Sequence, residues 1–493
     1  MINKIFFINP YPHYARGTNE ATVYPPLGIA YLAGMLEKHG YECKIIDANI
    51  LRMHNDDVLK IIEQEDPDVV CISINVSTAI AGNSLAREVK ERFNKKVIMG
   101  GVQASSVTER TLKNSLADAV IIGESEQTIL ELVKNDCSPN GILGLAYLEN
   151  DNVVYTGKRA LIENLDELPW PAYHLLPQLK LYKCRARKFP VAPIFTTRGC
   201  PYQCIFCSSS SKKSVFGPRF RVRSPENVVA EIEYLAEEFG VKQVDILDDN
   251  FTLDMKRAEK ICNILIERKN KVLINLQNGV RADRLTRELV FKLKKAGVFK
   301  AGIGIESGDQ QILKIAKKAL DLNQVRNAIK WFREAGIVVY GFFIFGLPGE
   351  NEETMQRTID FAIESNPHIA NFNGCLPLPG TEMYDIVEKE GKFLNPIIDG
   401  VEVGYQAGTY LYQIGDVNPA LINKYLKKAF REFYFRPSKI IEIAKISLSP
   451  GEIKWTFKAG YLIVKNLLAK KSENKGIFSK YFGALFKKTK VVA

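Results

Sequence analysis

The chain has 493 residues, of which 46% are hydrophobic and 25% are charged, a mixture that is typical of globular proteins and excludes a disordered chain or a small disulfide-held scaffold. At about 150 residues per domain, this length indicates roughly three domains. The net charge of +11 arises in residues 421–493, where 17 Lys and Arg accompany four Asp and Glu, so it does not describe the rest of the chain.

The amino terminus enters an apolar run at Lys4–Asn9 without the longer apolar region and cleavage site of a secretion signal. The sequence contains no stretch of about 18 apolar residues, so a membrane-spanning helix is not expected. Nine cysteines, an odd number spread over a long chain, do not form the pattern of a disulfide framework. We therefore expect a protein of the reducing cytoplasm.

Over residues 1–140, short β-branched runs alternate with amphipathic segments. The runs lie at Lys4–Asn9, Cys43–Asp47, Val69–Ile74, Lys96–Met99 and Ala119–Ile122. Strands that are apolar throughout are covered on both faces and need crossover helices, which predicts an α/β domain with a Rossmann-like, doubly wound parallel sheet. Ligands of such a domain bind at the carboxyl ends of its strands.

Residues 141–190 hold a small β-like piece and then Leu168–Pro171, whose two prolines are unsuited to a helix interior, so this segment is expected to be a linker. A second β/α series follows over 191–415. Its strands are predicted at Ile194–Thr197, Val244–Leu247, Leu273–Asn278, Ala301–Ile305, Val338–Phe345 and Asn371–Leu376. Six units predict a partial (β/α)6 barrel with its chemistry at the carboxyl ends of the strands. Residues 416–493 are expected to form a basic helical extension.

The loop after the first barrel strand reads Arg198-Gly199-Cys200-Pro201-Tyr202-Gln203-Cys204-Ile205-Phe206-Cys207. Three thiolates within eight positions, on a loop that contains Gly and Pro, can bind three irons of a [4Fe-4S] cubane and leave the fourth iron open to chelation. A structural zinc site is the alternative, and it would need a fourth ligand such as His174 or Cys184. The other cysteines are expected to be packing residues.

This loop resembles the cluster motif of the radical S-adenosylmethionine (SAM) superfamily, CxxxCxxC with an aromatic residue before the last cysteine, here Phe206. The resemblance implies that Cys200, Cys204 and Cys207 ligate the cluster. It also implies that the cluster passes one electron to SAM, which gives methionine and a 5′-deoxyadenosyl radical that abstracts a substrate hydrogen. The protein positions and tunes these cofactors.

Further residues at successive strand ends resemble SAM contacts of the same superfamily. The resemblance assigns the methionine amino group to the segment after the second strand and the carboxylate, ribose and adenine edge to those after the third, fourth and fifth strands. These residues are Asp248, Asp249, Asn250, Arg281, Glu306, Ser307, Gly346 and Pro348. Two alternatives remain, because acidic strand ends often cap the next helix and a Gly-Pro-Gly loop is often only a turn.

A doubly wound domain ahead of such a barrel resembles the cobalamin-binding domain of the B12-dependent branch of the superfamily. The resemblance rests on Pro25–Ala33, Met99–Gly101 and Gly123-Glu124. It implies cobalamin contacts from Leu27, Gly28, Gly100, Gly101, Gly123 and Glu124. Glycines at strand ends let a bulky planar ligand approach the backbone, although the same glycines could simply form tight turns.

One departure concerns the cobalt ligand. The DxHxxG motif of many cobalamin enzymes is absent, because Asn49 stands at the histidine position and Arg52 at the glycine position. This predicts cobalt without an imidazole from that position, and the loop with Asn75, Ser77 and Thr78 is expected below the corrin. The methylthiotransferase branch, which carries a second cluster, is disfavoured, because the amino-terminal cysteines lie on separate elements.

The segment Arg431–Ser438 and the residues after it resemble the carboxyl-terminal extensions of B12-dependent radical proteins related to the anaerobic tetrapyrrole cyclase and hopanoid-modifying enzymes. Aromatic residues alternate with basic ones at Phe430, Phe433, Tyr434, Phe435, Trp455, Phe457 and Tyr461. Two interpretations remain open: the helices dock on an anionic membrane, where each basic residue contributes about 1 kcal/mol, or their apolar face covers the barrel. Nucleic acid is not expected, because no binding module accompanies the charge.

The combined resemblance predicts a cobalamin-dependent radical SAM enzyme that acts on an unactivated carbon of a small-molecule or lipid-like substrate, most simply as a C-methyltransferase. An electron donor such as flavodoxin or ferredoxin would supply the reducing equivalent. A radical cyclase or ring-rearranging oxidoreductase that uses cobalamin is the alternative enzyme, and a light or redox sensor is the alternative without catalysis. The substrate itself cannot be inferred from a fold and its cofactors.

Overall fold

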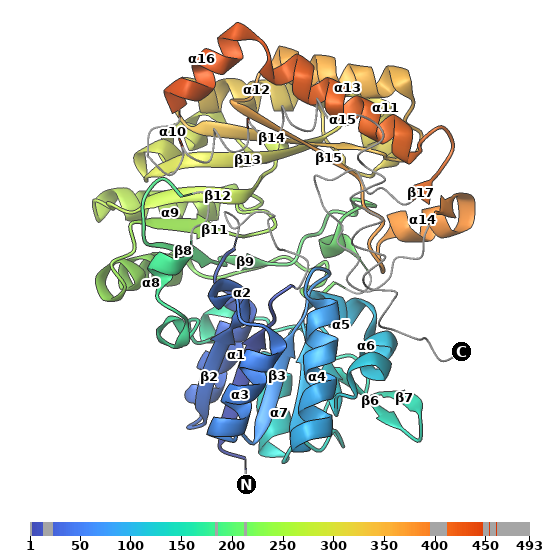
Figure 1. Cartoon of the computed structure of the whole chain (residues 1–493). Coiled ribbons are helices and arrows are strands. Elements are labelled where there is room, and N and C mark those ends of the chain that lie inside the picture. Colours follow the sequence, from blue (N-terminus) through green and yellow to red (C-terminus); the bar gives the residue numbers. More distant parts are fainter. Residues whose placement is uncertain are drawn as a thin grey trace.

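Two parallel sheets, one above the other, form the body of the molecule (Figure 1). This computed structural model describes residues 2–12, 23–182, 186–211, 214–394 and 412–446, together with positions 453 and 460. The amino-terminal sheet lies at the bottom of the view and the larger α/β unit at the top. The sequence runs from the first sheet into the second through residues that pack between them.

The amino-terminal sheet has seven strands in the order β2-β1-β3-β4-β5-β6-β7. The first five strands pair in parallel, and β6 and β7 extend the sheet as an antiparallel hairpin. The hairpin lies in the segment that was predicted to be a linker. The strand bounds are β1 Lys4–Asn9, β2 Glu42–Asp47, β3 Val69–Ser73, β4 Lys96–Gly100, β5 Ala119–Ile121, β6 Leu145–Glu149 and β7 Asn152–Tyr155.

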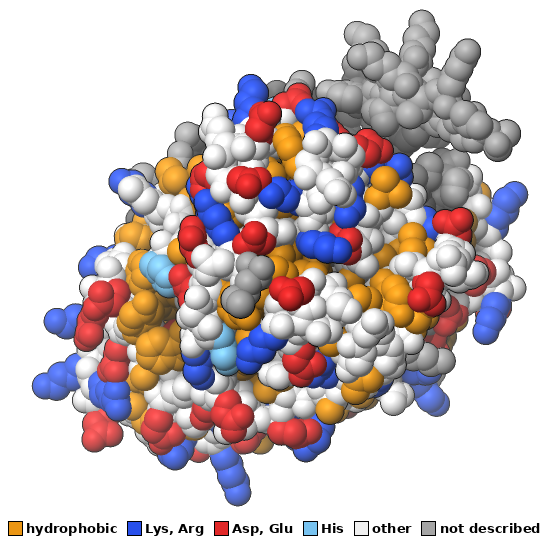
Figure 2. Space-filling model, turned by 90° about the horizontal axis from the view of Figure 1, so that it is seen from below, with side chains coloured by type: hydrophobic (Ala, Val, Ile, Leu, Met, Phe, Trp, Pro, Cys, Tyr) orange, Lys and Arg blue, Asp and Glu red, His pale blue; other side chains and the backbone are white. Residues whose placement is uncertain are grey.

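Helices cover both faces of this sheet, because its central strands are buried along almost their whole length. Helices α1 (Leu27–Glu37) and α7 (Glu126–Lys134) belong to one hydrophobic core, and α3 (Asn55–Glu65), α4 (Ala79–Phe93) and α6 (Thr108–Ser115) belong to the other. The sheet is therefore doubly wound, as predicted. Seen from below, acidic and basic side chains are interspersed over the described surface (Figure 2).

The upper unit is a half-barrel of six parallel strands in the order β15-β14-β13-β12-β11-β8. Its strands are β8 Val191–Ile194, β11 Gln243–Ile246, β12 Leu273–Val280, β13 Val298–Glu306, β14 Val338–Phe345 and β15 Ile369–Gly374. Helices pack on its outer face: α8 Pro225–Glu238, α9 Met255–Glu267, α10 Arg287–Lys295, α12 Leu322–Glu334 and α13 Glu352–Ser365. The partial barrel predicted from six β/α units is thus present.

The first barrel strand ends earlier than predicted. Strand β8 stops at Ile194, and Thr197–Arg198 forms the short strand β9, which pairs antiparallel with β10 (Arg221–Val222). The reason is the carboxylate of Asp248, which accepts hydrogen bonds from the backbone nitrogens of Thr196 and Thr197 and so bends the chain away from the sheet. The cysteine loop therefore leaves from β9, between the two sheets.

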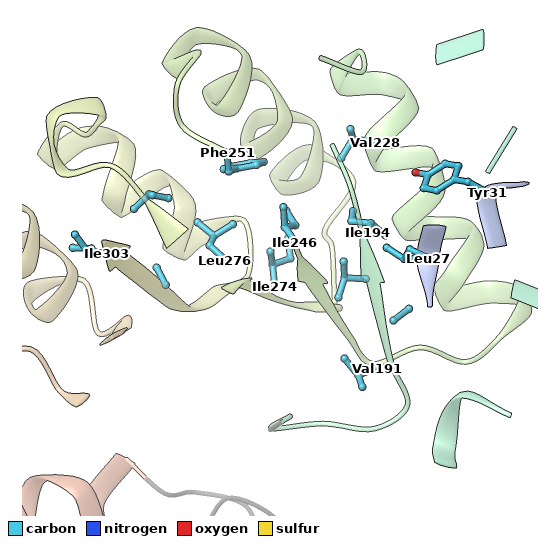
Figure 3. Close-up of a cluster of buried hydrophobic side chains, with 14 of the residues drawn as sticks. Leu27, Tyr31, Val191, Ile194, Val228, Ile246, Phe251, Ile274, Leu276 and Ile303 are labelled. Atoms are coloured by element: carbon cyan, nitrogen blue, oxygen red, sulfur yellow. The ribbon is translucent and has the colours of Figure 1, made fainter. Parts of the chain in front are cut away.

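One apolar core runs across the boundary between the two units. Leu27 and Tyr31 of α1 lie in the same cluster as Ile194 of β8 and Val228 of α8 (Figure 3). Polar contacts join the same boundary, since the Tyr182 hydroxyl donates to the buried Asp47 carboxylate at 2.7 Å. Burial of this apolar surface makes the relative placement of the two units part of the fold.

The carboxyl-terminal helix α15 (Pro419–Tyr434) packs on the outer face of β15. Its buried residues recur at helical spacing, and the ring of Phe433 lies 6.0 Å from that of Phe372, while the Tyr434 hydroxyl donates to the carbonyl oxygen of Ala370 at 2.6 Å. Packing on the barrel thus accounts for the aromatic residues of α15. Trp455, Phe457 and Tyr461 lie outside the described residues.

The next helix, α16 (Pro437–Ile446), leaves Ile440 and Ile441 more than half exposed. Within the described part of the chain, no helix is both long and apolar enough to cross a membrane.

Replacing Phe433 tests the packing of α15. Phe433→Ala should lower the free energy of unfolding by about 3–5 kcal/mol, because it removes a fully buried ring and leaves a cavity. Phe435→Ala is the matched control, since that ring is 50% exposed, and it should change stability by less than about 0.5 kcal/mol. Urea unfolding of both variants measures the difference. Equal losses would contradict the described packing.

Candidate functional site

The three motif cysteines lie on one loop between the sheets. None of the three is in a disulfide; Cys204 is buried, and Cys200 and Cys207 are partly exposed. The loop is compact, because the Ser210 hydroxyl donates to the carbonyl oxygens of Cys204 at 2.6 Å and Cys207 at 2.9 Å. Three free thiols on a partly open loop are a donor set that fits an iron–sulfur cluster with one open iron.

Burial keeps these thiols protonated while they carry no metal. It raises the pKa of Cys200 to about 11 and also raises the pKa of Cys204 and Cys207. The ammonium of Lys318 opposes this effect at Cys204. A bound metal replaces the proton of a coordinating thiol, so cluster binding would release protons here.

His174, the histidine that a zinc site on the cysteine loop could use as its fourth ligand, contacts another side chain instead. His174 is exposed and its Nε2 atom lies 3.1 Å from the Glu37 carboxylate, on the surface of the linker. Cys184 lies outside the described residues. Over the residues that the structure describes, no three His, Cys, Asp or Glu side chains are grouped to bind a single metal ion.

Arg281 clamps the cysteine loop. Its guanidinium lies 3.5 Å from the centroid of the Tyr202 ring, and it donates to Asp283 and to the carbonyl oxygens of Lys318 and Ala319. Each of its nitrogens has a protein acceptor, so Arg281 holds this loop in place, and its predicted contact with the SAM carboxylate stays a prediction. Its position after the third strand was inferred from the sequence, but its partners were not.

The end of the second barrel strand offers one unsatisfied side chain. Asp248 accepts hydrogen bonds from the backbone nitrogens of Thr196 and Thr197, so it shapes the loop, and its predicted contact with SAM stays a prediction. Asp249 accepts a hydrogen bond from the Ser209 hydroxyl at 2.9 Å, next to Cys207. Asn250 is 1% exposed, and neither its oxygen nor its nitrogen has a partner. Because an unmade buried hydrogen bond costs about 1–3 kcal/mol, Asn250 is a candidate ligand contact.

The fourth strand brings a buried ion pair to the site. Glu306 sits at a bulge with the left-handed φ of 69°, and its Oε1 accepts from Lys318 Nζ at 2.7 Å. Both side chains are about 10% exposed or less. Lys318 is the functional candidate that the sequence analysis missed, because it lies in a turn with no strand-end pattern to mark it. Ser307 is fully buried and its hydroxyl lies 3.1 Å from that of Thr358.

The loop after the fifth strand is fixed by a carboxyl group. Glu350 accepts from the backbone nitrogens of Gly346 at 2.5 Å and Leu347 at 2.9 Å, while its Oε1 has no partner. The Tyr412 hydroxyl donates to the Gly346 carbonyl at 2.6 Å, and Pro348 is buried. The predicted strand-end loop is thus ordered by protein contacts that leave one oxygen of Glu350 unsatisfied.

Among the predicted cobalamin contacts of the amino-terminal domain, some positions have free space beside them and others are packed against the protein. A Cβ atom at Gly28 or Gly100 would meet nothing within 4 Å, so both positions leave room for a bulky ligand. Gly101 adopts φ 97° close to the backbone of Ile74, which makes it a packing glycine. Leu27 is buried at the start of α1 and contributes to the core.

The loop after β3 is held by its own side chains. The side-chain oxygen Oδ1 of Asn75 accepts from the backbone nitrogens of Ser77 and Thr78, and the Thr78 hydroxyl accepts from the Asn75 backbone nitrogen at 3.0 Å. Ser77 is exposed and Thr78 is buried. The loop is therefore preorganised, with Ser77 the side chain that a ligand could reach.

The loop after β5 contains two predicted cobalamin contacts, Gly123 and Glu124. Gly123 leaves space, since its Cβ would lie 3.6 Å from the Val215 carbonyl. Glu124, however, accepts hydrogen bonds from Arg198 at 3.1 Å and from Arg221 at 2.8 Å, and from the backbone nitrogen of Ile162. Two buried arginines neutralise the carboxylate of Glu124, so it holds this loop in place, and its predicted contact with cobalamin stays a prediction.

Comparison with known proteins decides the family. The model of the B12 binding domain matches residues 16–133, and that of the radical SAM superfamily matches residues 194–362. An uncharacterised methyltransferase of Pyrococcus horikoshii is 34% identical over 447 residues, which cover 90% of this chain and 94% of that protein. The chain belongs to the cobalamin-binding radical SAM family. Its members are enzymes whose cofactors are cobalamin, a [4Fe-4S] cluster and SAM, which confirms the cofactors predicted from the sequence.

Other members of the cobalamin-binding radical SAM family span most of the chain. The cytidylyl-2-hydroxyethylphosphonate methyltransferase of Streptomyces wedmorensis is 29% identical and covers 82% of this chain and 85% of that protein. The anaerobic magnesium-protoporphyrin IX monomethyl ester cyclase of Rubrivivax gelatinosus is 30% identical and covers 77% of this chain and 69% of that protein. The radical enzyme OxsB, solved with aqua-cobalamin and SAM, shares the fold with a TM-score of 0.74 at 16% identity, over 98% of this chain and 75% of that one.

Glu350 makes stability depend on pH. Burial raises its pKa to about 8, from 4.5 in the unfolded chain. The folded state therefore binds more protons between these two values, so the free energy of unfolding should fall as pH rises from 4.5 to 8. Glu350→Gln should remove this part of the slope, measured by urea unfolding at pH 5, 6.5 and 8. A variant with the wild-type slope would show that another group is responsible.

Proposed function

We propose that this chain is a cobalamin-dependent radical SAM methyltransferase that adds a methyl group to an unactivated carbon of a small-molecule substrate. The observation that carries the proposal is the meeting of two candidate sites at one boundary. The loop after β5 of the amino-terminal sheet contacts β9, from which the cysteine loop leaves. A methyltransferase that aligns with 90% of the chain supports methyl transfer in particular.

Residues of the half-barrel would hold the cluster and SAM. Cys200, Cys204 and Cys207 are proposed as the cluster ligands, and Arg281 and Asp248 as residues that hold their loop. Asn250 supplies an unpartnered amide, and Lys318 supplies the buried ammonium beside Cys204. An amide and an ammonium suit the amino and carboxylate groups of a methionine moiety. Glu306 and Ser307 are proposed to lie toward the ribose, and the Gly346 to Pro348 loop toward the adenine.

Residues of the amino-terminal domain would hold cobalamin. The open position Gly100, together with Gly101, Gly123 and the loop with Asn75, Ser77 and Thr78, lies at or just beyond the carboxyl ends of parallel strands. Leu27 and the open position Gly28 begin α1, the helix that follows β1. His54 lies against the Tyr11 ring with the centroids 5.3 Å apart, at the start of α3. When bound, the cluster and SAM supply a carbon-centred radical and cobalamin supplies the methyl group.

A radical cyclisation is the second candidate function, because a cyclase relative is 30% identical over 77% of the chain. Reduction of the cluster by flavodoxin or ferredoxin is proposed for either reaction. Contact of the basic carboxyl-terminal residues with a membrane, and with it a lipid-like substrate, stays a prediction. The packing of α15 on the barrel supports neither the membrane contact nor the lipid-like substrate.

Loss of one cluster ligand should abolish SAM cleavage. After anaerobic reconstitution, Cys204→Ala should fall from about four irons per chain to background and form no 5′-deoxyadenosine under reductant. Cys262→Ala is the matched control, because Cys262 is also a buried cysteine and lies in α9, away from the loop. It should keep both iron and cleavage. Cleavage by the Cys204 variant would exclude the cluster assignment.

Transfer of a labelled methyl group separates methylation from cyclisation. Cells with and without the gene would be grown anaerobically with methionine that carries an isotopic methyl label. A methyltransferase should produce a gene-dependent metabolite that is heavier by one labelled methyl group, detected by mass spectrometry of polar and lipid extracts. A gene-dependent product without the label would favour the cyclase.

A further inference from the structure

The boundary between the two domains contains a buried ion-pair network directly before the cysteine loop. Arg198 donates to Glu124 at 3.1 Å and to Glu126 at 2.5 Å, and Arg221, its cross-strand neighbour on β10, donates to Glu124 at 2.9 Å. All four side chains are 6% exposed or less. The network thus joins a loop of the amino-terminal domain to a strand of the half-barrel.

Each end of the network lies next to one candidate cofactor site. Glu124 follows Gly123, whose backbone nitrogen donates to the Ser105 hydroxyl at 3.2 Å, in the helix α5 (Val102–Ser106) that follows Gly100 and Gly101. At the other end, Arg198 precedes Cys200 by two positions. Gly199 between them adopts φ 82°, and a side chain there would collide with the carbonyl oxygen of Arg219. The position of Arg198 is therefore closely tied to that of Cys200, the first proposed cluster ligand.

The electrostatics hold the network in its ionised form. Burial raises the pKa of Glu126, but the Arg198 guanidinium outweighs it, so the net pKa lies below the usual value. The aromatic rings of Tyr31 and Phe216 lie 5.3 and 5.0 Å from the Arg198 guanidinium and exclude water from it. A charge buried in this way cannot leave its partner without a large desolvation cost, so a change in the position of one loop is passed to the other.

We propose that Arg198 is a positioning residue that couples the two cofactor sites through Glu124 and Glu126. This inference rests on the proposed function, since it presumes a cluster on the cysteine loop and cobalamin at the strand ends. Ordering of the cysteine loop by the cluster fixes Arg198, and Arg198 fixes the Gly123 to Glu126 loop in the arrangement that accepts cobalamin. By linkage, cobalamin stabilises the cluster loop by the same factor.

The test compares cobalamin affinity with and without the cluster. Hydroxocobalamin would be titrated anaerobically into the full chain, either reconstituted with iron and sulfide or left free of metal, and binding read from the visible spectrum. The wild type should bind about tenfold more tightly once the cluster is assembled. In Glu126→Gln, which keeps a hydrogen-bond acceptor but loses the charge, this ratio should fall close to one.

Two further variants control for general effects. Arg198→Lys keeps the charge but loses the planar guanidinium that bonds both carboxylates at once. It should therefore also lower the ratio of the cobalamin affinities with and without the cluster. Arg219→Met removes an exposed ion pair with Glu163 from the same segment, where the side chains are 63% and 58% exposed, and it should keep the wild-type ratio. Loss of iron from Glu126→Gln with an unchanged urea midpoint supports coupling as well, because Glu126 belongs to the amino-terminal domain.

Three results would overturn the inference. They are a wild-type ratio of one, a wild-type ratio retained by Glu126→Gln, and a Glu126→Gln variant whose cobalamin affinity and urea midpoint fall equally with and without the cluster. All readings are made without turnover. A chain that shows the coupling but transfers no methyl group would therefore refute the proposed function alone.

Discussion

The pairing of Arg198 with two carboxylates is the interaction on which the arrangement of this molecule depends. Two parallel sheets can each bind a ligand at the carboxyl ends of their strands, but a reaction that involves both ligands needs those ends to face each other. The shared apolar core brings the units together without specifying an angle, because hydrophobic burial has no direction. The buried guanidinium adds direction, since its hydrogen bonds to Glu124 and Glu126 are satisfied in one geometry.

Polar groups in the half-barrel fall into two classes. Asp248 and Arg281 are saturated by protein partners and shape the cysteine loop, whereas both polar atoms of Asn250 and one oxygen of Glu350 have none. Satisfied groups set the shape of a site, whereas a buried unsatisfied group at a strand end is a candidate for a ligand contact. By this division Asn250 is the strand-end residue with the strongest case as a proposed contact for SAM, because neither of its polar atoms has a protein partner.

The strands could be predicted from the sequence, because apolar runs are local patterns, and the thiol spacing that marks the cysteine loop is local too. The side-chain partners at the strand ends could not be predicted. Arg281 and Glu124 both stand at the expected strand ends, but whether an ionic side chain meets a cofactor or another residue depends on chain segments distant in sequence, such as Lys318 for Arg281 and Arg221 for Glu124. Lys318 was missed for the same reason, because the bulge that presents Glu306 to it has no sequence period.

Gly199 sets a limit on how this loop could change during evolution or engineering. Because a side chain at Gly199 would collide with the backbone of Arg219, the single residue between Arg198 and Cys200 has to stay a glycine. A graft of the cysteine segment into another barrel would carry this requirement with it: the host would have to offer a bare carbonyl beside the glycine and an acidic pair beneath the arginine. The spacing of the three thiols alone is thus an incomplete description of what must be transplanted.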